Sequence, residues 1–360
     1  MLFRSIAWLT ARTFALVFFV AWVIFLVADV GDRLKLFMAH SAEDLVALYV
    51  NKALVAALQV GPLALLLAGG LSYSSLARRG ELGAAQSLGA SPRRLLAPAA
   101  AVALVVALGW SLFDEFVVTS AGQRVDELSV TRFQSWGDWR HYYTPKRWFR
   151  AGDHLVRVGQ YGSDGALEEV SLLLMDSAFT VTERWDAKVM RHVAGTRWAL
   201  EDVTVRRSSD ALNPSSQHHP SVQRELPGSF AEAFADVRGR PEWMRSKDLM
   251  RQAALRKRLG VSAEHVVWAL HNRWAFPLGG ALALLLTASL VFKVRAAQAT
   301  VVALTQGLAV SVALWVCTFL GKTAALSARW PPAWAAWFPC VVLLFGVGAL
   351  WVWPMPKTRA

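Results

Sequence analysis

Cysteine is scarce in this chain, with Cys317 and Cys340 the only two among 360 residues. Both lie in apolar stretches, which excludes a framework of structural disulfides and is typical of thiols that only pack. A complete phosphate-binding loop is also missing. Gly-Lys-Thr at 321–323 resembles the end of such a loop, but Val316 stands where its first glycine is required. The sequence therefore predicts no nucleotide site in this chain.

The side-chain sets of metal sites and hydrolases are missing as well. His265 and His271 are six residues apart, without the spacing of a metal-protease motif, and are expected to pack at an interface. His218 and His219 are expected to be ordinary loop residues. The apolar stretches contain no Ser/His/Asp set. We therefore expect a chain that is not an enzyme and has no catalytic residue, no metal and no cofactor.

Charged residues are absent from six long stretches, and this absence is the strongest signal in the sequence. A helix that crosses a bilayer needs about 20 consecutive apolar residues, and 55% of this chain is hydrophobic. We predict six transmembrane helices, three before and three after a polar middle region. The stretches without Asp, Glu, Lys or Arg are Thr13–Ala28, Ala53–Ala77, Leu95–Phe113, Trp274–Phe292, Ala296–Gly321 and Trp330–Pro356.

The formal charge of +12 is better explained by membrane topology than by nucleic-acid binding. A cytoplasmic N-terminus puts ten basic residues and one acidic residue, Glu81, into the inside segments. The loop at 29–52 then lies outside, with four acidic and three basic residues. Because short cytoplasmic loops are enriched in Lys and Arg, we predict cytoplasmic N- and C-termini and no nucleic-acid partner. The first apolar stretch lacks a small-x-small cleavage site and is expected to remain as a signal anchor.

The middle region alternates between apolar and polar residues, as half-buried β-strands do. Alternation runs through WFRAGDHLVRVGQY, EEVSLLLMD, FTVTERW, DAKVMRHV and TRWALEDVTVRRS, with turns at AGD, GSDG and AGT. This pattern predicts an inserted all-β domain outside the membrane, a sandwich or jelly roll. The Ser-, Pro- and Asn-rich stretch SSDALNPSSQHHPS at 208–221 is predicted to be a mobile loop.

After Pro241 the pattern returns to helix. SKDLMRQAALRKRLG has Ser246 as a plausible N-cap and Gly260 as a stop, which predicts a helix at the membrane surface. The predicted domains are 1–120 for the first three spans, 121–245 for the β domain, and 246–360 for this helix and the last three spans.

The connection RRGELGAAQSLGASPRR at 78–94 predicts a short cytoplasmic helix at 80–89, before a Ser-Pro pair that starts the third span. A lone carboxylate with small neighbours suits contact with a partner's arginine. An ordinary interfacial helix is the alternative. Its side chains form two adjacent stripes, one of Leu82, Ala85, Gln86 and Gly89, the other of Glu81, Ala84 and Leu88.

At this point a family resemblance emerges. LSYSSLARRGELGAAQSLGASPRRLLAPA resembles the Glu-Leu…Gly-x-Ser/Thr-x-x-Arg/Leu stretch of the lipopolysaccharide-export permeases LptF and LptG. Further similar segments, in the family's order, are GPLALLLAGGL, WFRAGDHLVRVG, ERWDAKVMRHVAGTRWALEDV, SKDLMRQAALRKRLGVSAEHVVWALHNRWAFPLGG and WPPAWAAWFPCVVLL. The ordered set covers nearly the whole chain, and the last segment is slightly closer to LptG.

The resemblance implies partners and a location. In that family two related permeases, each with six spans and a periplasmic β-jellyroll, bind two copies of a cytoplasmic ATPase, LptB. A single-span protein, LptC, joins them. The complex extracts lipopolysaccharide from the inner membrane of Gram-negative bacteria and passes it to a periplasmic bridge protein. By resemblance, residues 80–89 form the coupling helix that seats in the ATPase, with Glu81 as its acidic contact, and ATP is bound by that partner alone.

The resemblance also implies a lipid site between the two permeases, lined by spans one, two and five. Because the lipid carries anionic phosphates on apolar acyl chains, its site needs basic residues next to an apolar surface. Each candidate is alternatively an interfacial cation that snorkels to the surface. Family members often carry a basic residue about one turn before Arg33, where this chain has Asp29. The candidates are Arg33 and Lys35, then Lys52, Lys322 and Arg329, with Leu155, Val156, Leu172 and Leu174 as β-domain positions for acyl chains.

Two other functions fit the same sequence. One is a permease of this architecture for another lipid or lipoprotein, and the other is a membrane scaffold whose outside domain docks partners without transport. The helix at 80–89 discriminates between transport and scaffold, because a scaffold has no need to engage an ATPase.

Overall fold

In the computed structural model, the described residues are 2–33, 37, 40–132, 148–151, 154–161, 166–176, 180–207, 215–226, 240–258 and 262–352. They divide into two compact units. The membrane unit comprises Met1–Phe133, Pro241–Leu249 and Glu264–Ala360, and the β unit comprises Gln134–Arg240 and Met250–Ala263.

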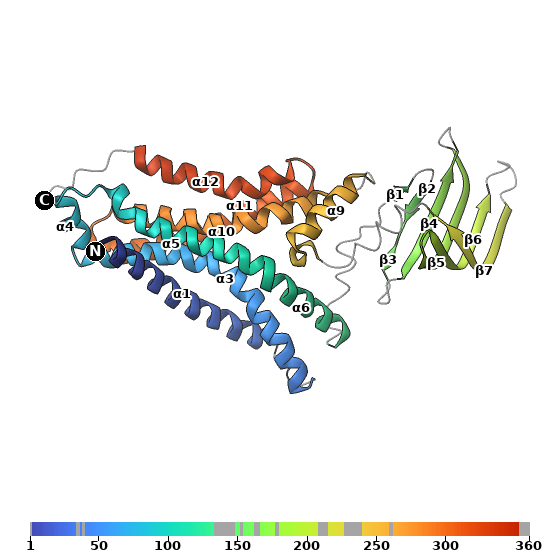
Figure 1. The fold of residues 1–360 in the computed structure, drawn as a ribbon, viewed down its shortest axis with the longest axis horizontal. Helices are drawn as coiled ribbons and strands as arrows, with labels where there is room; N and C mark the ends of the chain where they lie inside the picture. Colours follow the sequence, from blue (N-terminus) through green and yellow to red (C-terminus); the bar gives the residue numbers. More distant parts are fainter. Residues whose placement is uncertain are drawn as a thin grey trace. The chain divides into compact units, whose positions relative to one another are not determined.

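The membrane unit contains six helices long and apolar enough to cross a bilayer, which confirms the predicted six spans (Figure 1). Each predicted apolar stretch overlaps one of them. The third helix runs on past its apolar stretch as a π-helix and a further α-helix. In chain order the spans are α1 (Leu2–Asp32), α3 (Ala42–Arg78), α5 (Pro92–Phe113) with η1 (Asp114–Val118) and α6 (Thr119–Thr131), α10 (Glu264–Val291), α11 (Ala299–Leu326) and α12 (Pro332–Val352).

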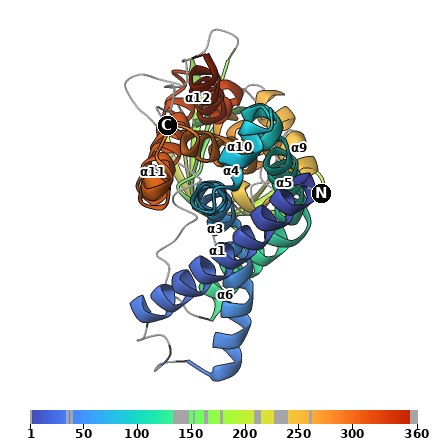
Figure 2. The ribbon, with the colours of Figure 1, turned by 90° about the vertical axis from the view of Figure 1, so that its left-hand side faces the viewer.

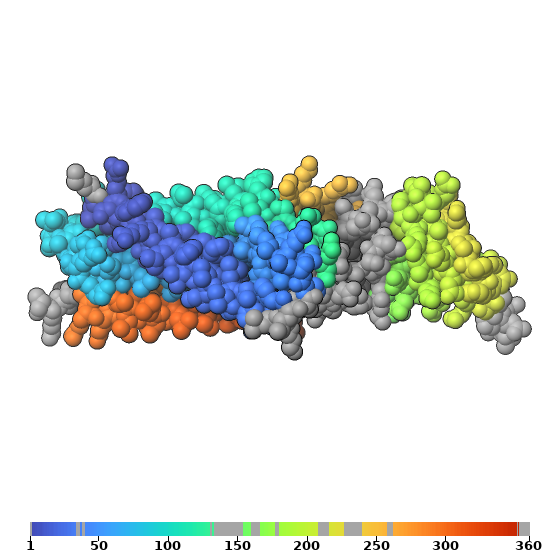
Figure 3. All heavy atoms as spheres, turned by 90° about the horizontal axis from the view of Figure 1, so that it is seen from below, coloured from blue at the N-terminus to red at the C-terminus, as the bar shows by residue number. Residues whose placement is uncertain are grey.

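Three shorter helices connect these spans: α4 (Glu81–Ser87), η2 (Pro241–Trp243) and η3 (Ala296–Gln298). The predicted surface helix is α9 (Ser246–Arg258), which begins in the membrane unit at Ser246. Seen along the bundle, α10 lies among α3, α5, α11 and α12 (Figure 2). In contrast, α1 lies along one face of the unit and leaves most of its side chains exposed (Figure 3).

Small residues let the two most buried spans, α3 and α10, approach closely. A Cβ at Gly280 would lie 2.8 Å from the Cα of Pro62, and one at Gly69 would lie 2.6 Å from the Leu284 carbonyl oxygen. The Thr287 hydroxyl donates a hydrogen bond of 2.9 Å across this interface to a backbone carbonyl of α3. Close packing of this kind stabilises helix pairs in a bilayer, where the hydrophobic effect does not drive them together.

The β unit contains one antiparallel sheet with the strand order β1-β2-β4-β5-β6-β7, and β3 also pairs with β4 (Figure 1). This confirms the predicted fold class of a membrane-helical protein with an inserted all-β domain. A jelly roll packs two sheets, and the described strands form one, so the jelly-roll packing stays a prediction. The strands are β1 (Trp148–Ala151), β2 (His154–Arg157), β3 (Gln160–Tyr161), β4 (Leu167–Met175), β5 (Val181–Ala194), β6 (Arg197–Arg207) and β7 (Ser215–Glu225).

The prediction of a loop at 208–221 is wrong in its second half. Residues 215–221 belong to β7, where His218 lies opposite Thr204 and His219 opposite Val203; residues 208–214 are not among those described. Ladder hydrogen bonds join backbone groups of any residue type, so a stretch rich in Ser and His pairs with β6 despite its loop-like composition. Among the described strands β7 is the last in the sheet order, and proline in a sheet is tolerated at such an edge position.

Candidate functional site

The short helix α4 is set off from the spans by two glycines with left-handed backbone, Gly80 at φ 73° and Gly89 at φ 87°. Residues other than glycine rarely adopt such backbone φ angles, so these glycines fix where the helix begins and ends. On one side of α4, Leu82 and Ala85 are buried. They join the apolar cluster of the bundle that includes Tyr73 from α3. The helix is therefore seated firmly on the spans that flank it.

The opposite side of α4 is exposed and carries one acidic residue. Glu81 has a side chain that is 42% exposed, and its carboxylate lies 3.9 Å from the Arg79 guanidinium. Leu88 is 89% exposed, an unusual position for a leucine. The predicted stripe of four residues is therefore split in the structure. Leu82 and Ala85 face inward, whereas Gln86 and Gly89 are exposed. The outward residues of the candidate set are Glu81, Ala84, Gln86, Leu88 and Gly89.

Two of the candidate basic residues meet on one carboxylate. Lys52 of α3 donates a hydrogen bond from Nζ to Oδ2 of Asp29 on α1. The Nε of Arg33, which directly follows the last residue of α1, lies 3.5 Å from Oδ1 of the same Asp29. Lys35 is not among the described residues. Asp29 therefore joins Arg33 to Lys52.

The other two basic candidates lie elsewhere. Lys322 on α11 places Nζ 3.2 Å from Oε1 of Glu242 and 5.1 Å from the centre of the Trp268 ring. Arg329 is exposed in the turn that follows α11.

A pocket of about 510 Å³ opens where α1, α3, α10 and α11 meet. It contains residues from the three spans that the resemblance assigns to the lipid. Its wall is mainly aromatic and aliphatic, and Glu242, the partner of Lys322, lies in its lining. A pocket with an apolar body and a few polar groups suits an amphipathic ligand. The apolar lining includes Phe25, Leu58, Leu63, Trp268, Phe276 and Trp315, and the polar lining includes Gln59, Asp114, Asn272, Arg273 and Thr318.

Arg273 at this pocket is the centre of a buried ionic cluster. Its side chain is 2% exposed. Its Nε donates to Asp114 Oδ2 at 2.8 Å, and its Nη1 donates to Glu115 Oε2 at 2.7 Å. Glu115 also accepts hydrogen bonds from the backbone N–H and the hydroxyl of Ser246. The cluster therefore links the start of α9 to α10 and to η1, the π-helix that continues α5.

Two consecutive acidic residues reach the same guanidinium at a point where the helix type changes. Asp114 and Glu115 open the π-helix η1, a wider turn than the α-helix and one that is frequent at functional sites. Sequence reasoning missed this cluster. The available signal was that Asp114 directly follows the apolar stretch of span three and Arg273 directly precedes that of span four, on the same predicted side of the membrane.

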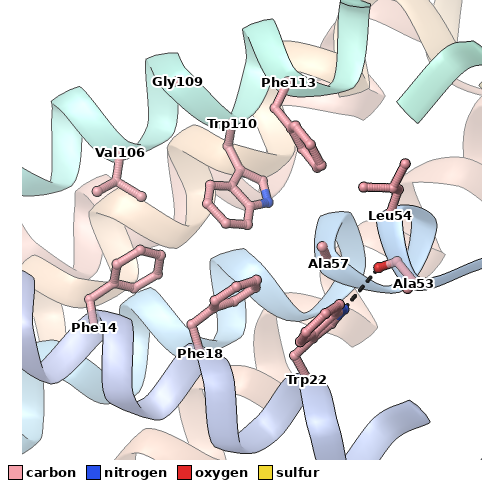
Figure 4. Close-up of a pocket in the computed structure, with 10 residues that line it drawn as sticks. All are labelled: Phe14, Phe18, Trp22, Ala53, Leu54, Ala57, Val106, Gly109, Trp110 and Phe113. Atoms are coloured by element: carbon pink, nitrogen blue, oxygen red, sulfur yellow. Dashed lines mark hydrogen bonds between the residues drawn. The ribbon is translucent and has the colours of Figure 1, made fainter. Parts of the chain in front are cut away.

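A second hollow, of about 460 Å³, lies between α1, α3 and α5 (Figure 4). Phe14, Phe18 and Trp22 follow one another along α1 and face Trp110 and Phe113 of α5. The Trp22 indole N–H donates to the Ala53 carbonyl at 2.8 Å. Among the described residues, no charged side chain lines this hollow, so it suits hydrocarbon and offers nothing to a head group.

In the β unit, two of the four candidate acyl-chain positions are fully buried. Val156 and Leu172 are 0% exposed and belong to the core of the sheet, whereas Leu155 and Leu174 are half-buried. A side chain enclosed by its own core does not contact a passing acyl chain. The half-buried pair therefore fits that role better than the buried pair.

A cluster of charges on the sheet predicts a pH dependence. The Trp185 indole N–H, 2.9 Å away, holds the pKa of the Glu183 carboxyl below its usual value, and Arg207 and Arg224 act in the same direction against the effect of burial. Stability from a lowered carboxyl pKa is present above the unfolded value, about 4.3, and is lost as the pH falls through the folded value. We expect Glu183→Gln to speed hydrogen exchange of β5 and β6 at pH 7, with the difference shrinking below about pH 4.

Exchange rates in this experiment are corrected for their intrinsic pH dependence. Glu201→Gln is the matched control, because Glu201 pairs with Arg191 at 3.4 Å with both side chains 48% exposed, and such surface pairs contribute little. Equal exchange of Glu183→Gln and the wild type at pH 7 would contradict the assigned role.

Six apolar helices, an inserted antiparallel β domain and a pocket with an amphipathic lining define a multi-pass membrane protein with an inserted β domain. The family model described as lipopolysaccharide export system permease LptF/LptG matches residues 4–353. The chain therefore belongs to the LptF/LptG family of transporter components. The match does not separate LptF-type from LptG-type members. A search of curated proteins finds no match.

Proposed function

We propose that this chain is a permease subunit of an ABC-type exporter that extracts lipopolysaccharide from the inner membrane and passes it to a periplasmic bridge protein. A dimer of an LptB-like ATPase drives the process, and a second LptF/LptG-type permease and an LptC-like protein complete the complex. Family membership supports a lipopolysaccharide export complex. The observation that carries the proposal for this chain is the pocket shared by α1, α3 and α11.

The proposed topology places α4 and both termini in the cytoplasm and the β unit in the periplasm. The start of α1 and the helix α4 lie at the same end of the bundle, and the Asp32 end of α1 lies at the other (Figure 1). Force applied to α4 reaches the spans through Leu82 and Ala85, which belong to the same buried cluster as Leu95 of α5 and Leu284 of α10. Because packed interiors transmit strain, α4 is suited to couple an ATPase on one side of the membrane to the pocket.

The lipid pocket is tested by crosslinking in cells. A photo-crosslinking amino acid at Thr318, in the pocket lining, is expected to capture lipopolysaccharide at least fivefold more often than one at Phe345. Phe345 on α12 is 74% exposed and serves as the control for general contact with lipid. Equal yields at the two positions would contradict the pocket. Capture of a different lipid at Thr318 would favour a permease for that lipid.

A further inference from the structure

The cluster of Asp29, Arg33 and Lys52 contains a feature that a simple phosphate site lacks, namely its own anion. Each oxygen of the Asp29 carboxylate faces one cation, with Lys52 Nζ on Oδ2 and Arg33 Nε 3.5 Å from Oδ1. The two cations come from different parts of the chain, since Lys52 lies in α3 and Arg33 directly follows α1. The three groups together carry one net positive charge.

This cluster is shielded from water more than a surface ion pair. The side chains of Asp29, Arg33 and Lys52 are 21%, 30% and 16% exposed. Lys52 Nζ also lies 5.2 Å from the centre of the Tyr49 ring, which is itself 5.2 Å from the ring of Phe37. In such partly dehydrated surroundings charges interact more strongly than in water, so the charge of an incoming anion decides whether it displaces the carboxylate.

We propose that Asp29 is a built-in competitor for the phosphate of the lipid. Asp29 pairs with Arg33 and Lys52 when no lipid is bound, and a group of higher charge is needed to displace it. This inference rests on the proposed function. A phosphodiester carries one negative charge, as Asp29 does, so exchanging one for the other gains no charge attraction. A phosphomonoester carries about −1.5 to −2 at pH 7 and gains attraction from both cations.

The consequence is selectivity among membrane lipids. Ordinary phospholipids with a phosphodiester head group surround the site in large excess, and Asp29 keeps them from occupying it. A lipid with phosphomonoester groups displaces Asp29 and is admitted. Asp29 is therefore a specificity-determining residue for the head group, and discrimination against the wrong ligand is achieved by a competing charge within the site.

The test compares Asp29→Asn with the wild type, each as the full chain with the subunits that purify with it. Binding of lipopolysaccharide and of phosphatidylglycerol, a phosphodiester lipid, is measured by competition in detergent. The wild type should prefer lipopolysaccharide. In Asp29→Asn, phosphatidylglycerol should bind at least fivefold more tightly and lipopolysaccharide less than twofold more tightly, so the preference falls. Asp29→Glu keeps the competing charge and should keep the preference for lipopolysaccharide.

The matched control is Asp32→Asn, which removes an exposed carboxylate from the same turn of α1. An equal loss of preference in this control, or an unchanged preference in Asp29→Asn, would overturn this inference but leave the proposed function standing. Inorganic phosphate at the same concentration should compete poorly because it lacks acyl chains; strong competition would assign the site to free phosphate and overturn it. A wild-type complex that binds neither lipid would overturn the proposed function, and this inference with it.

Discussion

Glu81→Lys is expected to lower recovery of the ATPase with the tagged chain at least tenfold, while the chain itself stays folded in the membrane. Glu81 is the single acidic residue of the proposed cytoplasmic segments, and its side chain is exposed on the outer side of α4. A lysine there replaces attraction to a partner's arginine by repulsion between like charges, and charge-assisted hydrogen bonds of this kind are among the strongest that proteins form. The ratio of ATPase to chain after affinity purification is the measurement.

Two further variants separate the position from the charge. Glu81→Gln removes the charge without reversing it and should give an intermediate loss. Gln298→Lys adds the same positive charge at an exposed position of η3, in the other short loop on the proposed cytoplasmic side, and should leave recovery unchanged. Full recovery of the ATPase with Glu81→Lys would show that α4 does not couple the two chains through this residue.

Arg273→Met is expected to destabilise the membrane unit by about 3–5 kcal/mol, the usual result when one partner of a buried ion pair is removed. Its guanidinium, 2% exposed, satisfies Asp114 and Glu115 at 2.8 and 2.7 Å. Without it, two carboxylates remain close together with little exposure to solvent, at 9% and 16% of their side-chain surface. The midpoint of thermal unfolding in detergent measures the loss.

Neutralising the partners provides the control. Arg273→Met combined with Asp114→Asn and Glu115→Gln removes the uncompensated charges, and should recover more than half of the lost stability. A single variant within 1 kcal/mol of the wild type would contradict the anchoring role. If the triple variant were no more stable than the single one, the lost packing of the arginine side chain would be the larger effect.

The spans were predictable from the sequence because the absence of charge over about 20 residues is a requirement of the bilayer itself. The bounds of α4 were predictable for a local reason too, since Gly80 and Gly89 mark its ends. The strand β7 was not, because its residues are polar and only the neighbouring strand β6 makes a strand of them.

The ionic clusters were not predicted, because their contacts between helices depend on which helices pack together. Arg33 and Lys52 were selected separately as cations. The i,i+4 spacing of Asp29 and Arg33 allows that pair, but the sequence does not show that Lys52 of another helix joins them. Arg273 and Asp114 are 159 residues apart and meet only through the packing of α10 against the helix formed by α5 and η1. Charges at the ends of apolar stretches were interpreted as membrane boundaries, whereas here they also bind one another.

The measurement that tests the central claim most directly is the composition of the complex in native membranes. The tagged chain is extracted in mild detergent, and the proteins and lipids that purify with it are identified by mass spectrometry. We predict recovery of an ATPase, a second six-span permease and lipopolysaccharide. An ATPase with a different lipid would contradict the substrate, and recovery of no ATPase from an extract in which other membrane complexes survive would contradict transport itself.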